Sequence, residues 1–134
     1  MAQVTEEMKQ TALKSKGWAL ATATKDGTPN VVVTAFGRVI SENQILLMDV
    51  FMNKTRANIE ANPNVAVAVW DMETLKGYQF KGTAHFETSG KIFDEGVQMV
   101  KSAMPQLTPK AALIVDVKQI YNLTPGPEAG REIA

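Results

Sequence analysis

The stretch Asn53-Lys54-Thr55-Arg56-Ala57-Asn58-Ile59-Glu60-Ala61-Asn62-Pro63 decides how the fold is interpreted. It separates an apolar run over residues 45–51 from a denser one over residues 65–70, which predicts a strand, a short helix and a strand. Asn53 is a residue type that caps helix N-termini, and Asn62-Pro63 ends the helix. Lys54 and Thr55 therefore stand at a helix N-terminus, where backbone N–H groups and the helix dipole favour a phosphate. The alternative is an ordinary capped helix with a solvated lysine.

Composition restricts the classes of function. The chain has 134 residues, 45% of them apolar, which predicts a single globular domain over residues 1–134. Its formal net charge is zero, so nucleic acid is not an expected partner. It has no cysteine and a single histidine, His85, which argues against a metal site. It lacks both a membrane-spanning apolar run and a signal-peptide core, so we expect a soluble cytoplasmic protein without membrane partners.

Apolar periodicity and turn residues predict a mainly β fold with short helices. The predicted strands are residues 18–24, 29–39, 44–49, 65–70, 77–87 and 111–116, with 119–123 extending or following the last. Residues 65–70 are apolar without alternation, which predicts a strand covered on both faces, whereas residues 77–87 alternate, which predicts one buried and one wetter face. Asp26-Gly27 is a hairpin signal between the first two strands. Besides the central helix, one helix is expected over Thr5–Lys16 within residues 1–16, and another over residues 92–104. The first of these has Met8, Ala12 and Leu13 on its apolar side, and Glu6 and Glu7 favour its first turn. Residues 124–134 form a loop or an arm. A small antiparallel barrel with helices outside it fits this order.

Several other residues are candidates for chemistry. Thr34, within an apolar strand, is either a plain β-former or a hydroxyl that reaches a ligand. Asp49-Val50-Phe51 closes a strand, so its backbone groups are free to meet the edge of a heterocycle. His85 fits a surface histidine better than a catalytic one, because no nucleophile accompanies it. Trp18 and Trp70 fit core or interface positions better than flavin stacking.

The order of several motifs resembles a known family. The motifs are Ala21-Thr22-Ala23-Thr24, Asp26-Gly27-x-Pro29-Asn30-Val31-Val32, Lys54-Thr55-Arg56-Ala57-Asn58-Ile59, Asn62-Pro63-x-Val65 and Gly77-Tyr78-Gln79-Phe80-Lys81-Gly82. Together they resemble the pyridoxamine 5′-phosphate oxidase-like family of FMN-binding split β-barrels, in particular its small FMN-binding proteins. The resemblance covers residues 17–123. It implies a six-stranded antiparallel Greek-key split β-barrel and a homodimer with FMN at the interface.

The resemblance also implies which residues hold the cofactor. Lys54 and Thr55 match positions that hold the FMN phosphate, with Asn58 one turn further along the same helix. Thr34 matches a strand position that faces the phosphate or the ribityl chain.

Other implied cofactor contacts lie on two strands. The backbone of Asp49, Val50 and Phe51 matches a strand end that runs along the isoalloxazine edge. Tyr78 and Gln79 match a strand that comes near the cofactor. In such proteins the C-terminal tail often reaches toward the partner subunit, which would give residues 125–131 a role.

The chain also departs from true pyridoxamine phosphate oxidases. Those proteins are longer and carry an arginine and a histidine in a C-terminal strand, whereas this tail has Arg131 and no histidine. We therefore expect an FMN-binding flavoprotein in electron transfer, or a small flavin-dependent oxidoreductase, and not a true pyridoxamine phosphate oxidase. The alternatives are a non-catalytic binding module for a deazaflavin, haem or another phosphate-bearing ligand, and a structural dimer with a decayed site. The sequence assigns no catalytic residue and no redox partner.

Overall fold

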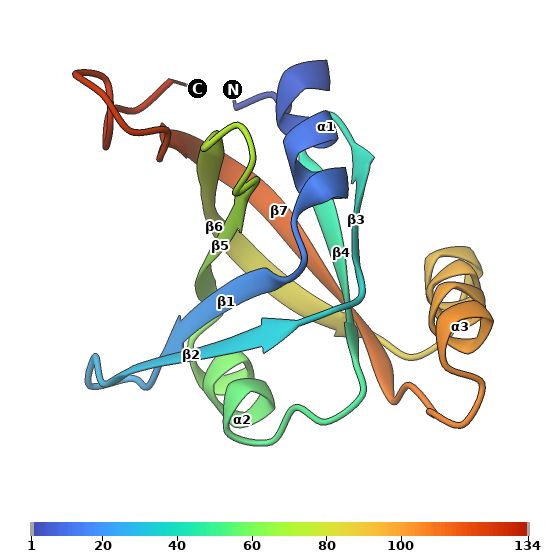
Figure 1. Ribbon diagram of the computed structural model, residues 1–134. Coiled ribbons are helices and arrows are strands. Elements are labelled where there is room, and N and C mark those ends of the chain that lie inside the picture. The colour runs from blue at the N-terminus through green and yellow to red at the C-terminus, as the bar shows by residue number, and fades with distance from the viewer. Residues whose placement is uncertain (1, 134) are drawn as a thin grey trace.

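A curled antiparallel sheet with three helices around it forms the body of the molecule (Figure 1). The computed structural model describes residues 2–133. Its helices are α1 (Glu6–Lys14), α2 (Lys54–Ala61) and α3 (Lys91–Ala103). Its strands are β1 (Trp18–Ala23), β2 (Pro29–Thr34), β3 (Gly37–Ser41), β4 (Gln44–Asp49), β5 (Asn64–Trp70), β6 (Gly77–Glu87) and β7 (Ala111–Asn122). None of the helices within this range is long and apolar enough to cross a membrane.

The strands follow the order β2-β1-β5-β6-β7-β4-β3, and every neighbouring pair is antiparallel. This confirms the predicted antiparallel split barrel but gives seven strands over residues 2–133 instead of six. The predicted strand over residues 29–39 divides, because β2 pairs with β1 while β3 pairs with β4. Its two halves lie at opposite edges of the sheet, joined by Ala35 and Phe36. The apolar run continues across this break, so periodicity did not reveal it.

The predicted hairpin between β1 and β2 is confirmed. Gly27 has a φ of 92°, a backbone angle that residues with a Cβ atom rarely adopt but glycine adopts freely. The Asp26 carboxylate accepts hydrogen bonds from the hydroxyls of Thr24 and Thr28, and these bonds lower its pKa below the ordinary value. The turn therefore closes on its own polar groups and fixes the register of β1 against β2.

The core consists of two clusters of buried apolar side chains. One cluster fills the inside of the curled sheet around Leu20, Val67 and Phe80, and a second lies between β4, β7 and α3 around Met48 and Ile114. Strand β5 was predicted to be covered on both faces. In the structure its valines are buried, but its alanines are only half-buried on the outer face, so that expectation is wrong for a single chain.

Helix boundaries are close to those predicted. Thr5 caps α1, accepting from the Met8 N–H at 3.3 Å, and Glu6 and Glu7 occupy the first turn as expected. The helix ends at Lys14, before the predicted Lys16–Gly17 boundary. Leu13 was placed on the apolar side but is exposed, because the buried side is formed by Met8, Thr11 and Ala12. Helix α3 packs its buried Val100 toward β4 and β7.

The alternation predicted for β6 is confirmed, with Tyr78, Phe80 and Ala84 buried. A register shift between Lys81 and Gly82 interrupts its pairing with β7. Strand β7 runs unbroken to Asn122, longer than its pairing with β4, which stops at Asp116.

The predicted loop or arm after β7 returns onto the strand. The Asn122 N–H donates to the Arg131 carbonyl and the Ile133 N–H to the Ile120 carbonyl, both at 2.8 Å. Residues 131–133 therefore pair with the end of β7, beyond its pairing with β4.

Candidate functional site

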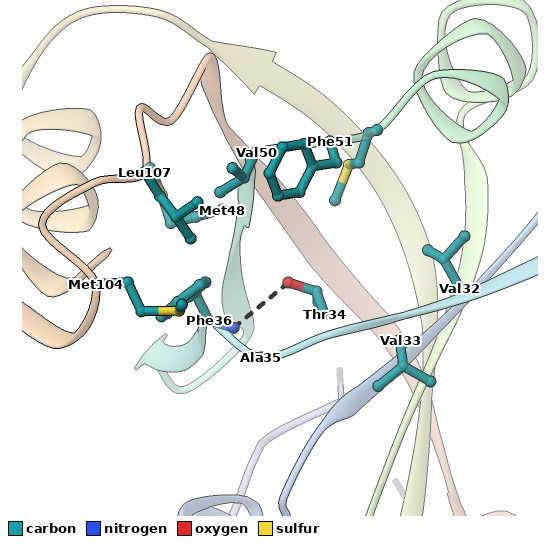
Figure 2. Close-up of a pocket in the computed structure, with 11 residues that line it drawn as sticks. Val32, Val33, Thr34, Ala35, Phe36, Met48, Val50, Phe51, Met104 and Leu107 are labelled. Carbon is teal, nitrogen blue, oxygen red and sulfur yellow. Dashed lines mark hydrogen bonds between the residues drawn. The ribbon is translucent and has the colours of Figure 1, made fainter. Parts of the chain in front are cut away.

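A cleft opens where β2 and β3 diverge (Figure 2). It has a volume of about 490 Å³. Phe51 and Thr34 face each other across it, and Met104 and Leu107 close it from the side of α3. The lining residues are Val32, Val33, Thr34, Ala35, Phe36, Met48, Val50, Phe51, Met52, Met104 and Leu107. The split of the sheet therefore creates a cavity that a closed barrel would lack.

The cleft is chemically simple. Among the described residues that line it, Thr34 has the only polar side chain, and none is titratable. The Phe36 N–H donates weakly to the Thr34 hydroxyl at 3.4 Å, which leaves the O–H hydrogen available for another acceptor. Phe51 is 75% exposed, although a large apolar side chain gains by burial. Such a cavity suits a flat, largely apolar ring system.

Helix α2 begins beside this cleft at Lys54, as predicted, but without the expected cap. Asn53 stands at the N-cap position with φ −121° and ψ −77°, and its side chain makes no capping hydrogen bond. Asn53 therefore occupies the predicted N-cap position, but its side chain does not cap the helix. Within residues 2–133 the N–H groups of Lys54, Thr55 and Arg56 have no hydrogen-bond acceptor. With the exposed ammonium of Lys54, they form an electropositive helix start.

The first turns of α2 are joined to the β1–β2 hairpin by four uncharged side chains. The Asn30 amide donates to the hydroxyls of Thr22, at 3.2 Å, and Thr55, at 3.1 Å. The Asn58 amide donates to the same Thr22 hydroxyl at 3.0 Å. We call Thr22, Asn30, Thr55 and Asn58 the hairpin–helix cluster. Thr55 is only 1% exposed, so its hydroxyl is directed into this cluster rather than to the solvent.

A second connection anchors the loop between β4 and α2. The fully buried Asp49 carboxylate accepts from the Met52 N–H at 2.9 Å and from Arg56 Nε at 3.3 Å. The Arg56 guanidinium also lies over the Phe86 ring, 4.4 Å from its centre. Asp49 thus fixes the segment that carries Val50 and Phe51 into the cleft.

The predicted cofactor residues fall into groups. Thr34, Val50 and Phe51 line the cleft, and Lys54 stands at the helix start next to it. Thr55 and Asn58 belong to the hairpin–helix cluster. Asp49 lies beneath the cleft loop, with its backbone carbonyl accepting from the Lys110 N–H.

Gln79 is not brought to these residues. It lies on β6, paired with Ala68 and Tyr121, and it is absent from the cleft lining.

Sequence reasoning missed two parts of the site. Met104 and Leu107 follow α3, and no local pattern relates them to a cleft formed by residues 32–52. Asn30 and Thr22 belong to motifs of the family resemblance, but the sequence assigned no contact to either. A signal existed for Asn30, because it shares one face of β2 with Val32 and Thr34 at a spacing of two.

His85 lies away from the cleft, on the outer face of β6. Its Nε2 is 3.0 Å from Glu87 Oε2, and its Nδ1 is 3.8 Å from Asp116 Oδ2. Residues 2–133 contain no group of three or more histidine or acidic side chains arranged to hold a metal ion.

Solved structures share this fold. HupZ of Group A Streptococcus superimposes with a TM-score of 0.81 at 30% identity, over 95% of this chain and 99% of that one. An FMN-binding protein from Syntrophomonas wolfei gives 0.77 at 16% identity, over 90% and 88%. The haem storage protein HutZ of Vibrio cholerae gives 0.65 at 18% identity, over 90% and 94%. The last two likenesses are likenesses of fold.

Sequence comparison gives the family. The uncharacterized protein MJ0282 of Methanocaldococcus jannaschii is 38% identical over 136 aligned positions, which cover 100% of this chain and 90% of that protein. Residues 4–124 match the profile of pyridoxamine 5′-phosphate oxidase, and they include every element from α1 to β7. By this match and by its split-barrel fold, the chain belongs to the pyridoxamine 5′-phosphate oxidase family.

Proposed function

We propose that this protein is an FMN-binding flavoprotein that acts in electron transfer or as a small flavin-dependent oxidoreductase. One observation carries the proposal: an uncapped, electropositive helix start adjoins an apolar cleft. FMN combines a dianionic phosphate with a flat, largely apolar ring system. The fold likeness to an FMN-binding protein supports the same ligand.

The phosphate end of FMN fits the start of α2. Lys54 supplies a positive charge, and the unpaired N–H groups of residues 54–56 supply donors in the geometry that helix N-termini offer to anions. Met52 lines the cleft two residues before Lys54, so their Cα atoms are at most about 7 Å apart. Both ends of one ligand can therefore be held by a single continuous segment.

The ring end fits the cleft. Burial against Val50, Phe51 and Met48 would remove apolar surface from water, and Thr34 offers a hydroxyl. The N–H groups of Val50 and Phe51 have no acceptor among residues 2–133, so they are available to a heterocycle.

FMN supplies the redox chemistry when it is bound. The chain positions the cofactor and excludes water from one side of it. Because the described lining has no titratable side chain, we assign no general acid or base. The lining also has no cationic side chain that would hold a second phosphate, and Arg131 pairs with Glu128 at 2.7 Å in the tail. We therefore do not propose the pyridoxamine phosphate oxidase reaction.

We further propose a homodimer with FMN at the interface. On the outer face of β2, Val31 and Val33 are 65% and 67% exposed. They are opposite Ala21 and Ala19 of β1, which pair in turn with Ala66 and Ala68 of β5. We call these six residues the valine–alanine face; a second copy would bury it.

The proposed dimer would also account for Gln79, which lies outside the cleft of a single chain. Gln79 is opposite Ala68 in the register between β5 and β6 and therefore borders the valine–alanine face. A second copy of the chain is what would bring it near a cleft.

Haem is the alternative that the fold likeness to HutZ supports. The one imidazole of the chain is His85, and its two ring nitrogens face Glu87 and Asp116. It lies outside the apolar cleft, so ring burial and axial ligation would not coincide in one chain. For this reason we favour FMN.

The absorption spectrum of the purified protein tests the proposal. We expect the two-banded spectrum of an oxidised flavin, either directly or after saturation with added FMN, and release of FMN on denaturation. A Soret band would favour haem, and a deazaflavin in the released fraction would favour that cofactor. A colourless protein that does not bind added FMN would refute the proposal. Anaerobic reduction with NADH and NADPH in turn then distinguishes a reductase from a pure electron carrier.

A further inference from the structure

The hairpin–helix cluster connects strands β1 and β2 to helix α2 through side-chain hydrogen bonds. Asn30 uses both hydrogens of its amide group on bonds between elements, one to Thr22 of β1 and one to Thr55 of α2. Thr22 in turn accepts from Asn58, one turn further along α2. The cluster therefore holds the second and fifth residues of the helix against the hairpin, while the N–H groups of its first turn are left unpaired.

The geometry points to Asn30 as a positioning residue for the phosphate of FMN, and this inference rests on the proposed function. By holding the Thr55 hydroxyl, Asn30 sets the rotation and tilt of the first turn of α2. Thr55 is enclosed, so it acts through its position and not through direct exposure to the ligand. The groups that would contact the phosphate are the N–H groups of residues 54–56 and the Lys54 ammonium.

The other side-chain connection of the first turn, from Arg56 to Asp49, ties the helix to the cleft loop and not to the hairpin. Helix α2 has eight residues and no side-chain cap, and isolated helices of this length are marginal. Hydrogen bonds from N–H groups weaken steeply when the donor turns away from the acceptor. Asn62 makes a comparable connection at the other end of the same helix, where its amide donates to the Thr24 carbonyl of the same hairpin at 3.4 Å. That connection supports the helix but lies away from its first turn.

The experiment compares two ligands that differ only in the phosphate. Dissociation constants for FMN and riboflavin are measured by titration for the wild type, Asn30→Ala and Asn62→Ala. We expect Asn30→Ala to raise the Kd for FMN roughly three- to tenfold and the Kd for riboflavin less than about twofold, as one or two misplaced hydrogen bonds predict. Asn62→Ala is the matched control, with an unchanged ratio of the two constants.

A cycle of variants separates positioning from folding. Thr55→Val removes the acceptor of the Asn30 amide, so the Thr55→Val and Asn30→Ala double variant should lose little more FMN affinity than the worse single variant. Asn30→Asp keeps the size of the side chain but cannot donate and adds a negative charge near the phosphate, so it should lose at least as much affinity for FMN as Asn30→Ala. Thermal melting of every variant shows that it is folded at the titration temperature.

The other outcomes overturn the inference in distinguishable ways. Equal losses for FMN and riboflavin, or a changed ratio in Asn62→Ala, would reduce Asn30 to a general structural residue. A wild type that prefers FMN, with Asn30→Ala retaining that preference, would refute the role of Asn30 and leave the proposed function intact. A wild type that binds FMN no better than riboflavin would refute the phosphate site, and one that binds neither would refute the proposed function as well.

Discussion

Lys54 and Thr55 are neighbours in the chain but face different surroundings. Lys54 is exposed, whereas Thr55 is enclosed by the hairpin–helix cluster. A helix turns by about 100° per residue, so adjacent side chains point in different directions. Their predicted shared role in holding phosphate therefore divides in the structure: the Lys54 charge is exposed and available to a ligand, whereas the Thr55 hydroxyl is bonded within the cluster.

Lys54→Ala should weaken binding of FMN at least tenfold, corresponding to ~1.4 kcal/mol, because it removes the positive charge at the helix start. Binding of riboflavin should change much less. Calorimetric or fluorescence titration measures both constants. Lys91→Ala, at an 87% exposed lysine on α3, is the control and should leave both unchanged. Unchanged FMN affinity in Lys54→Ala would rule out Lys54 as the phosphate anchor.

Asp49→Ala should lower the free energy of unfolding by about 2 to 4 kcal/mol, because it leaves the Met52 N–H and the Arg56 guanidinium without their buried acceptor. Denaturant unfolding measures the loss. Asp49→Asn keeps an acceptor for Met52 and should lose less. If Asp49→Ala were as stable as the wild type, the carboxylate would not anchor the cleft loop.

At the scale of elements, the sequence predicts correctly those features that depend on residues close together in the chain. The Asp26-Gly27 hairpin and the alternation of β6 each depend on neighbouring residues, and both were predicted correctly. The division of residues 29–39 into β2 and β3 depends on pairing partners far along the chain. The same limit applies to the cleft. Val50 and Phe51 were predictable as site residues from their place after a strand, whereas Met104 and Leu107 line the cleft only through tertiary packing.

Glycine at the register shift of β6 gives a test at this scale. A Cβ on Gly82 would collide with the carbonyl oxygen of Asp116 in β7, and backbone cannot yield as a flexible side chain can. Gly82→Ala should therefore lower the free energy of unfolding by about 2 kcal/mol or more. Thr83→Ala, at the next and half-exposed position, should cost clearly less in the same denaturant titration. Equal stabilities would show that the strands separate there easily.

At the scale of the whole molecule, the valine–alanine face includes the side of β5 that the sequence predicted to be buried and that a single chain leaves half-buried. Its apolar sequence predicts two covered faces, but a single chain covers only one. The small alanines of β1 and β5 leave this face flat, and the valines of β2 project from it. A second copy packed on this face would bury the outer side of β5 and so remove the difference between the prediction and the structure.

Replacing Val31 and Val33 together by lysine should convert a dimer into a monomer, because two desolvated charges would oppose each other across the interface. Sedimentation equilibrium measures the change, and the melting temperature of the wild type should rise with protein concentration. Met72→Lys alters an equally exposed apolar residue outside this face and should leave the dimer intact. A wild type that sediments as a monomer at every concentration would contradict the proposed assembly.

The return of residues 131–133 onto β7 has a consequence for the behaviour of concentrated protein. Beyond Asp116, β7 has lost β4 as a neighbour, and its outward N–H and C=O groups would form an open template for strands of other molecules. The bonds from Asn122 to Arg131 and from Ile133 to Ile120 occupy that template. Residues 131–133 therefore block this edge against pairing with other molecules, and a variant that lacks them is expected to fold but to self-associate through β-strand pairing.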